Sequence, residues 1–212
     1  TYQCDSLMAA PNGDKLWDSF LAEAVGKGLK GKQLHNAIPH RRMSATIYKN
    51  YPQGKITVTD FLLGQYYLYE DALNSQEWNI ESDSMKVVLG HECQKATCSF
   101  RGRKWTAWFA LDVPVSDGPL KFCGLPGLIM EVYDRGKQYY FCINGMQQVS
   151  ATPITFGILD KDFKHFQKTD RKDFLLSKYR YLRNQNSINE ASTGISLGSV
   201  DEALKYDLIE KE

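Results

Sequence analysis

The sequence lacks any apolar run that approaches the roughly 20 residues of a transmembrane helix. It also lacks a charge excess, because 26 Lys and Arg residues stand against 25 Asp and Glu residues, for a formal net charge of +1. Proteins that bind nucleic acids concentrate basic residues on one face, so this balance argues against such a partner. We expect no transmembrane segment and no nucleic-acid ligand.

Familiar catalytic and metal-binding motifs are absent or lack their usual context. The sequence contains no HExxH motif, and its five cysteines show no CxxC spacing. One GxSxG match, Gly194-Ile195-Ser196-Leu197-Gly198, lies in the stretch 185–200, which is rich in Ser, Asn, Thr and Gly and is predicted to be a loop, not the strand–turn–helix of a nucleophile elbow. These observations argue against a serine hydrolase of the α/β type, a zinc peptidase and a zinc knuckle. We therefore expect no metal ion and no cofactor, and we favour a protein without enzymatic activity.

Two constellations keep a hydrolase open as an alternative. His91 and Cys93 share one face of a predicted strand, which is an arrangement that a Cys–His nucleophile could use. Asp112 and Asp117 flank the entry to a loop and could form an acid/base pair. The ordinary interpretations are a histidine at the rim beside a buried or disulfide-bonded cysteine, and aspartates that cap a turn.

Among the residues that are present, the stretch 118–129 is the most informative. It contains Gly118, Pro119, Gly124, Pro126 and Gly127 among large apolar residues, a mixture that neither a helix nor a central strand tolerates. Pro126-Gly127 suits the middle of a type II turn, in which the glycine has a positive φ. We call residues 118–129 the signature loop and expect it to fold over against a core and to lead into a strand.

The motif Gly124-Leu125-Pro126-Gly127-Leu128-Ile129 resembles the signature of the GLPGLI family, largely uncharacterised envelope proteins of the Bacteroidota. The resemblance extends from about residue 40 to about residue 185. It includes the segments 47–52, 54–60, 90–96, 100–109, 131–134 and 171–174. It implies an exported protein of the periplasm, the outer membrane or the cell surface, one that works near outer-membrane transporters. It also implies that a signal peptide and one or two strands precede the matched part.

Periodicity predicts an α+β domain. Apolar residues recur at helical spacing over 14–28 and 170–184, and the second of these begins at Asp170. Between the helices, alternation with a period of two predicts a series of antiparallel hairpins. The predicted strands cover 43–51, 55–61, 66–70, 78–81, 85–89, 91–100, 104–111, 128–134 and 138–143. We expect a single domain over 1–212, with one strongly curved sheet in the form of a half-open barrel.

Five large side chains are candidates for the lining of that curved sheet: Trp105, Phe109, Val132, Tyr139 and Phe141. Their alternation places them on single faces of two hairpins, and an aromatic concave surface suits an apolar or peptide-like ligand. The prediction is a binding protein for such a ligand or for another envelope protein. Two alternatives stay open: the second helix fills the space, or the protein is a purely structural surface component.

Two further features give expectations about contacts. In an oxidising compartment we expect a disulfide that joins Cys142 to Cys93 or Cys98. The basic residues Arg101, Arg103 and Lys104 lie at a predicted hairpin tip, where such residues are ordinarily solvated. The alternative for this tip is a contact of the arginines with a phosphate or a carboxylate.

Overall fold

The computed structural model describes residues 13–30, 33–34, 37, 45–148, 150, 165–193 and 208–211. The chain divides into two compact units. One, here called the sheet unit, comprises Thr46–Leu175 and Asp207–Glu212, and the other comprises Thr1–Ala45 and Leu176–Tyr206. The expectation of one domain over 1–212 stays a prediction.

Two helices appear where the periodicity predicts them. Helix α2 spans Gly13–Gly26, and helix α4 spans Arg171–Thr193. The side chain of Asp170 accepts a hydrogen bond from the backbone N–H of Lys172 (2.7 Å), which caps α4 as the sequence indicates. The predicted end at residue 184 is wrong, because α4 continues to Thr193. None of the described helices is both long enough and apolar enough to cross a membrane.

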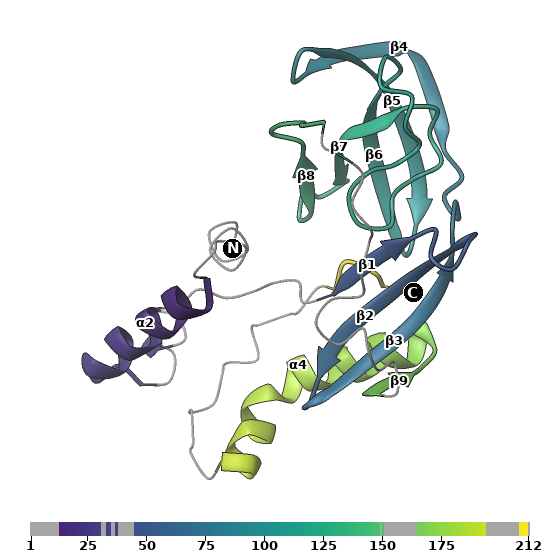
Figure 1. The fold of residues 1–212 in the computed structure, drawn as a ribbon. Coiled ribbons are helices and arrows are strands. Elements are labelled where there is room, and N and C mark those ends of the chain that lie inside the picture. The colour runs from purple at the N-terminus through teal and green to yellow at the C-terminus, as the bar shows by residue number, and fades with distance from the viewer. Residues whose placement is uncertain are drawn as a thin grey trace. The chain divides into compact units, whose positions relative to one another are not determined.

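The first sheet of the sheet unit has four strands in the order β1-β2-β3-β9 (Figure 1). The first three strands form an antiparallel meander, and β9 pairs in parallel with β3. The bounds are Thr46–Lys49 for β1, Lys55–Leu62 for β2, Gln65–Ala72 for β3 and Phe166–Lys168 for β9. The sequence reading missed β9, because three residues are too few for a pattern of alternation.

The second sheet has five antiparallel strands in the order β4-β5-β6-β7-β8. The bounds are Asn79–Val88 for β4, His91–Phe100 for β5, Arg103–Ala110 for β6, Leu128–Asp134 for β7 and Tyr140–Cys142 for β8. Strand β4 is continuous where the sequence predicts two strands. A register shift between Glu81 and Met85 accommodates the interruption in the alternation.

The strands do not form a half-open barrel. The nine described strands form two separate sheets, and no closed or strongly curved barrel is found among them. The α+β class is confirmed, whereas the barrel is a correction. Alternation along a strand shows that one face is buried, but it does not show whether another strand, a helix or a loop covers that face.

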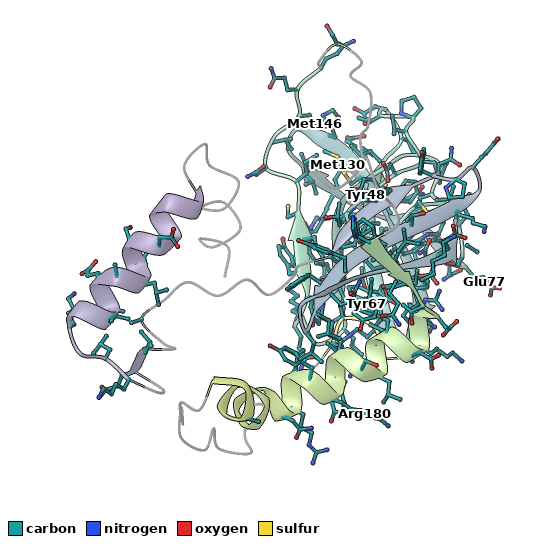
Figure 2. All side chains as sticks on the ribbon, turned by 60° about the horizontal axis from the view of Figure 1, so that its bottom comes forward. Tyr48, Tyr67, Glu77, Met130, Met146 and Arg180 are labelled. Atoms are coloured by element: carbon teal, nitrogen blue, oxygen red, sulfur yellow. The ribbon has the colours of Figure 1, made fainter. Side chains whose placement is uncertain are left out.

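Each sheet is covered differently. On the four-stranded sheet, Tyr67 points toward the first turns of α4 (Figure 2), and its ring centroid lies 5.4 Å from that of Phe174. On the five-stranded sheet, the covering layer is the signature loop, whose Phe122 ring lies 4.7 Å from the ring of Trp105. The main core of the sheet unit therefore lies between the five-stranded sheet and the signature loop.

Candidate functional site

The signature loop packs its apolar residues inward, as the sequence predicts. Phe122, Leu125 and Ile129 are at most 3% exposed and join the core cluster of the five-stranded sheet. Gly124 has a φ of +90°, a value that favours glycine. Leu120 also has a positive φ, of 54°. The loop is thus a strained segment that is held by its apolar contacts.

Glycine is required at position 127, but not for the reason that the sequence indicates. No positive φ occurs at Gly127 or Gly118, so the type II turn with a left-handed Gly127 does not form. Both glycines are instead required by close approach. A Cβ at Gly127 would lie 2.0 Å from the carbonyl oxygen of Ala110, and a Cβ at Gly118 would lie 2.8 Å from the Cβ of Ile129.

Polar side chains from outside the signature loop satisfy its backbone. Lys49 of β1 donates to the carbonyl oxygens of Gly118 (2.5 Å) and Phe122 (2.8 Å), and also to the Asp117 carboxylate. The indole N–H of Trp78 donates to the carbonyl oxygen of Cys123 at 2.8 Å. The loop therefore contacts both sheets of the sheet unit. These bonds join segments about 45 to 70 residues apart in the chain.

The predicted ligand-lining residues do come together, but they form a filled core. Trp105, Phe109 and Val132 are at most 2% exposed, and Tyr139 and Phe141 pack against them. The covering side chain above Trp105 is Phe122 of the signature loop. The second helix, which was the alternative filler of this space, instead contacts the other sheet, where its Phe174 ring lies against Tyr67 and Tyr69. A ligand role for the five residues stays a prediction.

The two hydrolase constellations are arranged differently from the sequence hypothesis. Nδ1 of His91 lies 2.7 Å from Oδ2 of Asp112, at an exposed position. Cys93 is fully buried, its Sγ faces the backbone carbonyl of His91, and burial raises the pKa of its thiol. Asp117 is bound to Lys49 and accepts a hydrogen bond from the Gly118 N–H, which is a capping role. The structure thus pairs His91 with Asp112. It brings together neither the thiol of Cys93 with the imidazole of His91 nor the carboxylates of Asp112 and Asp117.

The four described cysteines, Cys93, Cys98, Cys123 and Cys142, are free. The predicted bridge from Cys142 to Cys93 or Cys98 does not form in this structure. Strands β6 and β7 lie between β5 and β8. Three strand spacings amount to about 14 Å, well beyond the roughly 7 Å Cα separation that a disulfide permits.

The sequence reading missed a buried cluster of charged side chains. Lys121 of the signature loop donates to the carboxylates of Asp71 (2.7 Å) and Glu210 (2.5 Å), and all three side chains are at most 10% exposed. Arg101 lies 3.0 Å from Asp71, and Arg171 at the start of α4 lies 3.4 Å from Glu210. We call these five residues the ion cluster. No local pattern signals it, since its members come from five distant segments.

Tyr69 lies beside the ion cluster, which affects the hydrogen bonding and the pKa of its hydroxyl. Its hydroxyl accepts a hydrogen bond from Lys121 at 3.2 Å. Burial, followed by the nearby carboxylates of Glu210, Asp71 and Asp60, raises the pKa of Tyr69 far above its ordinary value. The Tyr69 hydroxyl therefore remains protonated at neutral pH. Among the described residues, no group of three or more His, Cys, Asp or Glu side chains is placed to hold a metal ion.

Arg103 corrects the expectation of a solvated hairpin tip. Its guanidinium is buried and donates to the Asp134 carboxylate at 2.9 Å. It also donates to the backbone carbonyls of Leu208 (2.8 Å) and Ile209 (2.9 Å). The alternative reading, in which the arginines contact a carboxylate, is the one that the structure shows.

The described residues of the four-stranded sheet line a cleft with a volume of about 500 Å³. We call it the sheet cleft. Its lining is formed by Tyr51, Pro52, Gln53, Thr57, Leu68, Glu70, Phe166 and Lys168. Most of the lining surface is apolar, and the lining contains one acidic and one basic residue.

Exposed aromatic rings continue the sheet cleft along the same face. Tyr66 pairs with Phe61 of β2 and with Phe166 of β9, so the three side chains share a face with Leu68, two residues further along β3. The ring of Tyr66 lies 4.8 Å from that of Phe61 and 5.7 Å from that of Phe166. Phe61 remains 48% exposed. We call Phe61, Tyr66 and Phe166 the aromatic row.

Comparison with protein families gives one match. A family model described as "Protein of unknown function (Porph_ging)" matches residues 100–131. The matched segment begins at the end of β5, includes β6 and the signature loop, and ends within β7. The match is consistent with the resemblance to a Bacteroidota envelope family. No curated protein matches the chain.

Solved structures with partial likeness include two crystal forms of one protein. "Structure of PNGF-II in P21 space group" is 15% identical with a TM-score of 0.38, and "Structure of PNGF-II in C2 space group" is 16% identical with a TM-score of 0.39. Each likeness covers 58% of this chain and 22% of that chain. The chain thus spans about a fifth of the length of these structures.

Proposed function

We propose that this is a non-catalytic binding protein of the bacterial envelope, and that it holds an apolar, peptide-like segment of a partner in the sheet cleft. The single observation that carries the proposal is the cleft of about 500 Å³ with its continuation into the aromatic row. Ligand sites of proteins have volumes of roughly 300 to 1,000 Å³ and a mainly apolar lining with a few polar groups. The sheet cleft has both properties.

The chemistry of the lining supports a short, uncharged or mixed-charge segment. Leu68 and Phe166 supply apolar contact, while Glu70 and Lys168 carry opposite charges at the same cleft. Lys55 lies 2.5 Å from Glu70, so the acidic side of the cleft is already partly compensated. A long anionic polymer has no counterpart here, in keeping with the near-zero net charge of the chain.

The cellular location and the family of the protein are part of the same proposal. The signature loop lies within the matched residues 100–131, and the segments that resemble the GLPGLI family extend well beyond them. We propose membership of that family, export to the periplasm or the outer membrane, and a role accessory to transport. Fractionation of the native host, with the protein followed by an antibody, tests the address. Recovery in the cytosolic fraction would contradict it.

Binding is tested by titration with an environment-sensitive apolar dye at neutral pH. We expect one saturable site whose affinity falls in a Phe166→Ala variant, because that ring lines the cleft and belongs to the aromatic row. Val87→Ala is the matched control, since Val87 is 68% exposed on β4 and lies outside the cleft. Absence of saturable binding, or an equal loss in both variants, would contradict the proposal.

A further inference from the structure

The 208–211 segment is bound to the sheet unit in the way that proteins bind peptides. It forms no strand. The guanidinium of Arg103 donates hydrogen bonds to the backbone carbonyl oxygens of Leu208 and Ile209, and the backbone carbonyl oxygen of Arg101 accepts one from the N–H of Lys211 at 3.1 Å. The rest of the sheet unit thus recognises main-chain groups of the segment, a recognition mode that is independent of most of the segment's side chains.

Two side chains of the segment enter the host. Ile209 packs against the apolar cluster that contains Trp105 and Phe122. Glu210, with 9% of its surface exposed, places its carboxylate among Lys121, Arg171 and Arg101. An apolar side chain followed directly by an acidic one is therefore the pattern that this position accepts.

Within the ion cluster, three cations face Asp71, and the position of Glu210 requires a second anion. Asp71 accepts contacts from Arg101, Lys121 and Arg171 together. Glu210 adds the second carboxylate that these cations contact. Buried cations that lose a carboxylate partner are strongly disfavoured, so the position occupied by Glu210 selects for a carboxylate rather than for a neutral group.

The chain's own segment does not satisfy this position completely. Nε of Arg101 is buried without a hydrogen-bond partner, and the nearest carboxylate oxygen of Glu210 lies 3.9 Å away. That separation is too long for a hydrogen bond. An occupant whose carboxylate approached Arg101 more closely would form a bond that Glu210 leaves unmade.

From these contacts we infer that Arg101, Arg103, Lys121 and Arg171 form a recognition site for a peptide segment with an apolar–acidic pair, which the chain's own Ile209 and Glu210 occupy. A partner segment of the same chemistry competes for the site. The site is separate from the sheet cleft, none of whose lining residues it contains. Its ligand differs as well, since a carboxylate is essential here.

The test uses a fluorescein-labelled synthetic peptide with the sequence of residues 207–212, titrated into the full chain and followed by anisotropy. An attached segment competes at an effective concentration on the order of millimolar. We therefore expect weak binding to the natural chain. In a Glu210→Gln chain, the chain's own segment binds the site more weakly, while Arg101, Arg103, Lys121 and Arg171 are unchanged. This chain should bind the peptide at least about tenfold more tightly.

Three controls give the result its meaning. Glu92→Gln, a change at an exposed glutamate of β5, should leave binding as weak as in the natural chain. A peptide with Gln in place of its first Glu should bind the Glu210→Gln chain at least about tenfold more weakly. Val87→Ala, a change at an exposed residue of β4 outside both sites, should not alter binding. Equal binding of the two peptides, or equal affinity of the natural and Glu210→Gln chains, would overturn the inference.

A second measurement needs no variant and decides the matter if Glu210→Gln fails to fold. Hydrogen exchange of the natural chain is followed with and without millimolar peptide. Displacement should accelerate exchange of the Lys211 amide, which is bonded to Arg101, at least about tenfold, while the amides of the β5–β6 ladder stay protected. Unchanged exchange at Lys211 would overturn the inference.

Discussion

The backbone of Gly127 contacts the backbone of Ala110, at the end of β6, so closely that a side chain has no room. A Cβ at position 127 would lie 2.0 Å from the Ala110 carbonyl oxygen and 2.7 Å from its carbonyl carbon. The neighbouring atoms are backbone atoms of a buried strand, so they cannot move aside as the end of a flexible side chain could. This contact fixes where the signature loop passes into β7.

Gly127→Ala should therefore lower the free energy of unfolding by at least about 2 kcal/mol, because an extra group forced into a packed core typically costs about 1 to 3 kcal/mol. Urea denaturation followed by tryptophan fluorescence measures the change. Gly145→Ala is the matched control, because no atom lies within 4 Å of a Cβ at position 145. It should change the free energy by less than about 0.5 kcal/mol. Comparable stability of the two variants would show that the loop does not approach Ala110 in solution.

Gly124→Ala should cost less than Gly127→Ala, and for another reason. The φ of +90° at Gly124 is unfavourable for alanine, whereas the nearest atom to a Cβ there, Oδ1 of Asn74, lies at an unstrained 3.6 Å. We expect a loss of about 1 kcal/mol in the same denaturation experiment. A loss as large as that of Gly127→Ala would indicate a steric cause instead.

Lys49→Met should destabilise the sheet unit by about 2 to 3 kcal/mol, because it removes the donor to the Gly118 and Phe122 carbonyl oxygens. Methionine retains the apolar stem of the lysine. Lys55→Met provides the comparison, since Lys55 also pairs with a carboxylate but is 51% exposed. Exposed pairs contribute less than about 1 kcal/mol. Equal losses in thermal or urea unfolding would mean that Lys49 does not hold the loop.

Stability should fall in alkaline solution through Cys98. Burial raises the pKa of its thiol from the ordinary 9.0 to about 12. The folded state therefore keeps the proton while the unfolded state loses it, so this contribution is complete below pH 9 and declines as the pH rises toward 12. The decline is about 1.4 kcal/mol per pH unit for one proton. Urea unfolding between pH 8 and pH 10.5 should show a shallower decline for Cys98→Ala, and parallel curves would exclude this role.

Among the four cysteines that the structure describes, thiol labelling of the native protein should reach Cys142 first. Cys142 is exposed, whereas Cys93, Cys98 and Cys123 are buried, and burial raises the pKa of the Cys93 and Cys98 thiols. Iodoacetamide labelling with peptide mapping measures each site separately. The same map, taken without reduction, should contain no peptide that links Cys142 to Cys93 or Cys98. A linked peptide would confirm the sequence prediction and contradict the order of strands.

Local structure was largely predictable because it depends on neighbouring residues. The alternation in β5 and β7 gave both strands with their observed bounds, and Arg101-Gly102 indicated the turn between β5 and β6, where both residues have a positive φ. The apolar residues of the signature loop were predicted to be buried, and they are. Strand β9 was not predictable, since its three residues pair with β3 across about a hundred positions.

The site was less predictable for the same physical reason. Trp105 and Val132 were expected to border a pocket, and only the folded path of the loop shows that Phe122 fills the space above them. The ion cluster joins Asp71, Arg101, Lys121, Arg171 and Glu210 from segments that no local pattern connects.

By itself, then, the sequence determined the α+β class, two helices, the hairpins and the inward packing of the signature loop, because propensity and periodicity act over a few neighbouring residues. Only the tertiary structure decided that the strands form two sheets, that Gly127 is required by contact with Ala110, and that Glu210 completes a buried cluster of cations. Those features depend on which distant segments meet, and the free energy of such contacts appears only when the chain has brought them together.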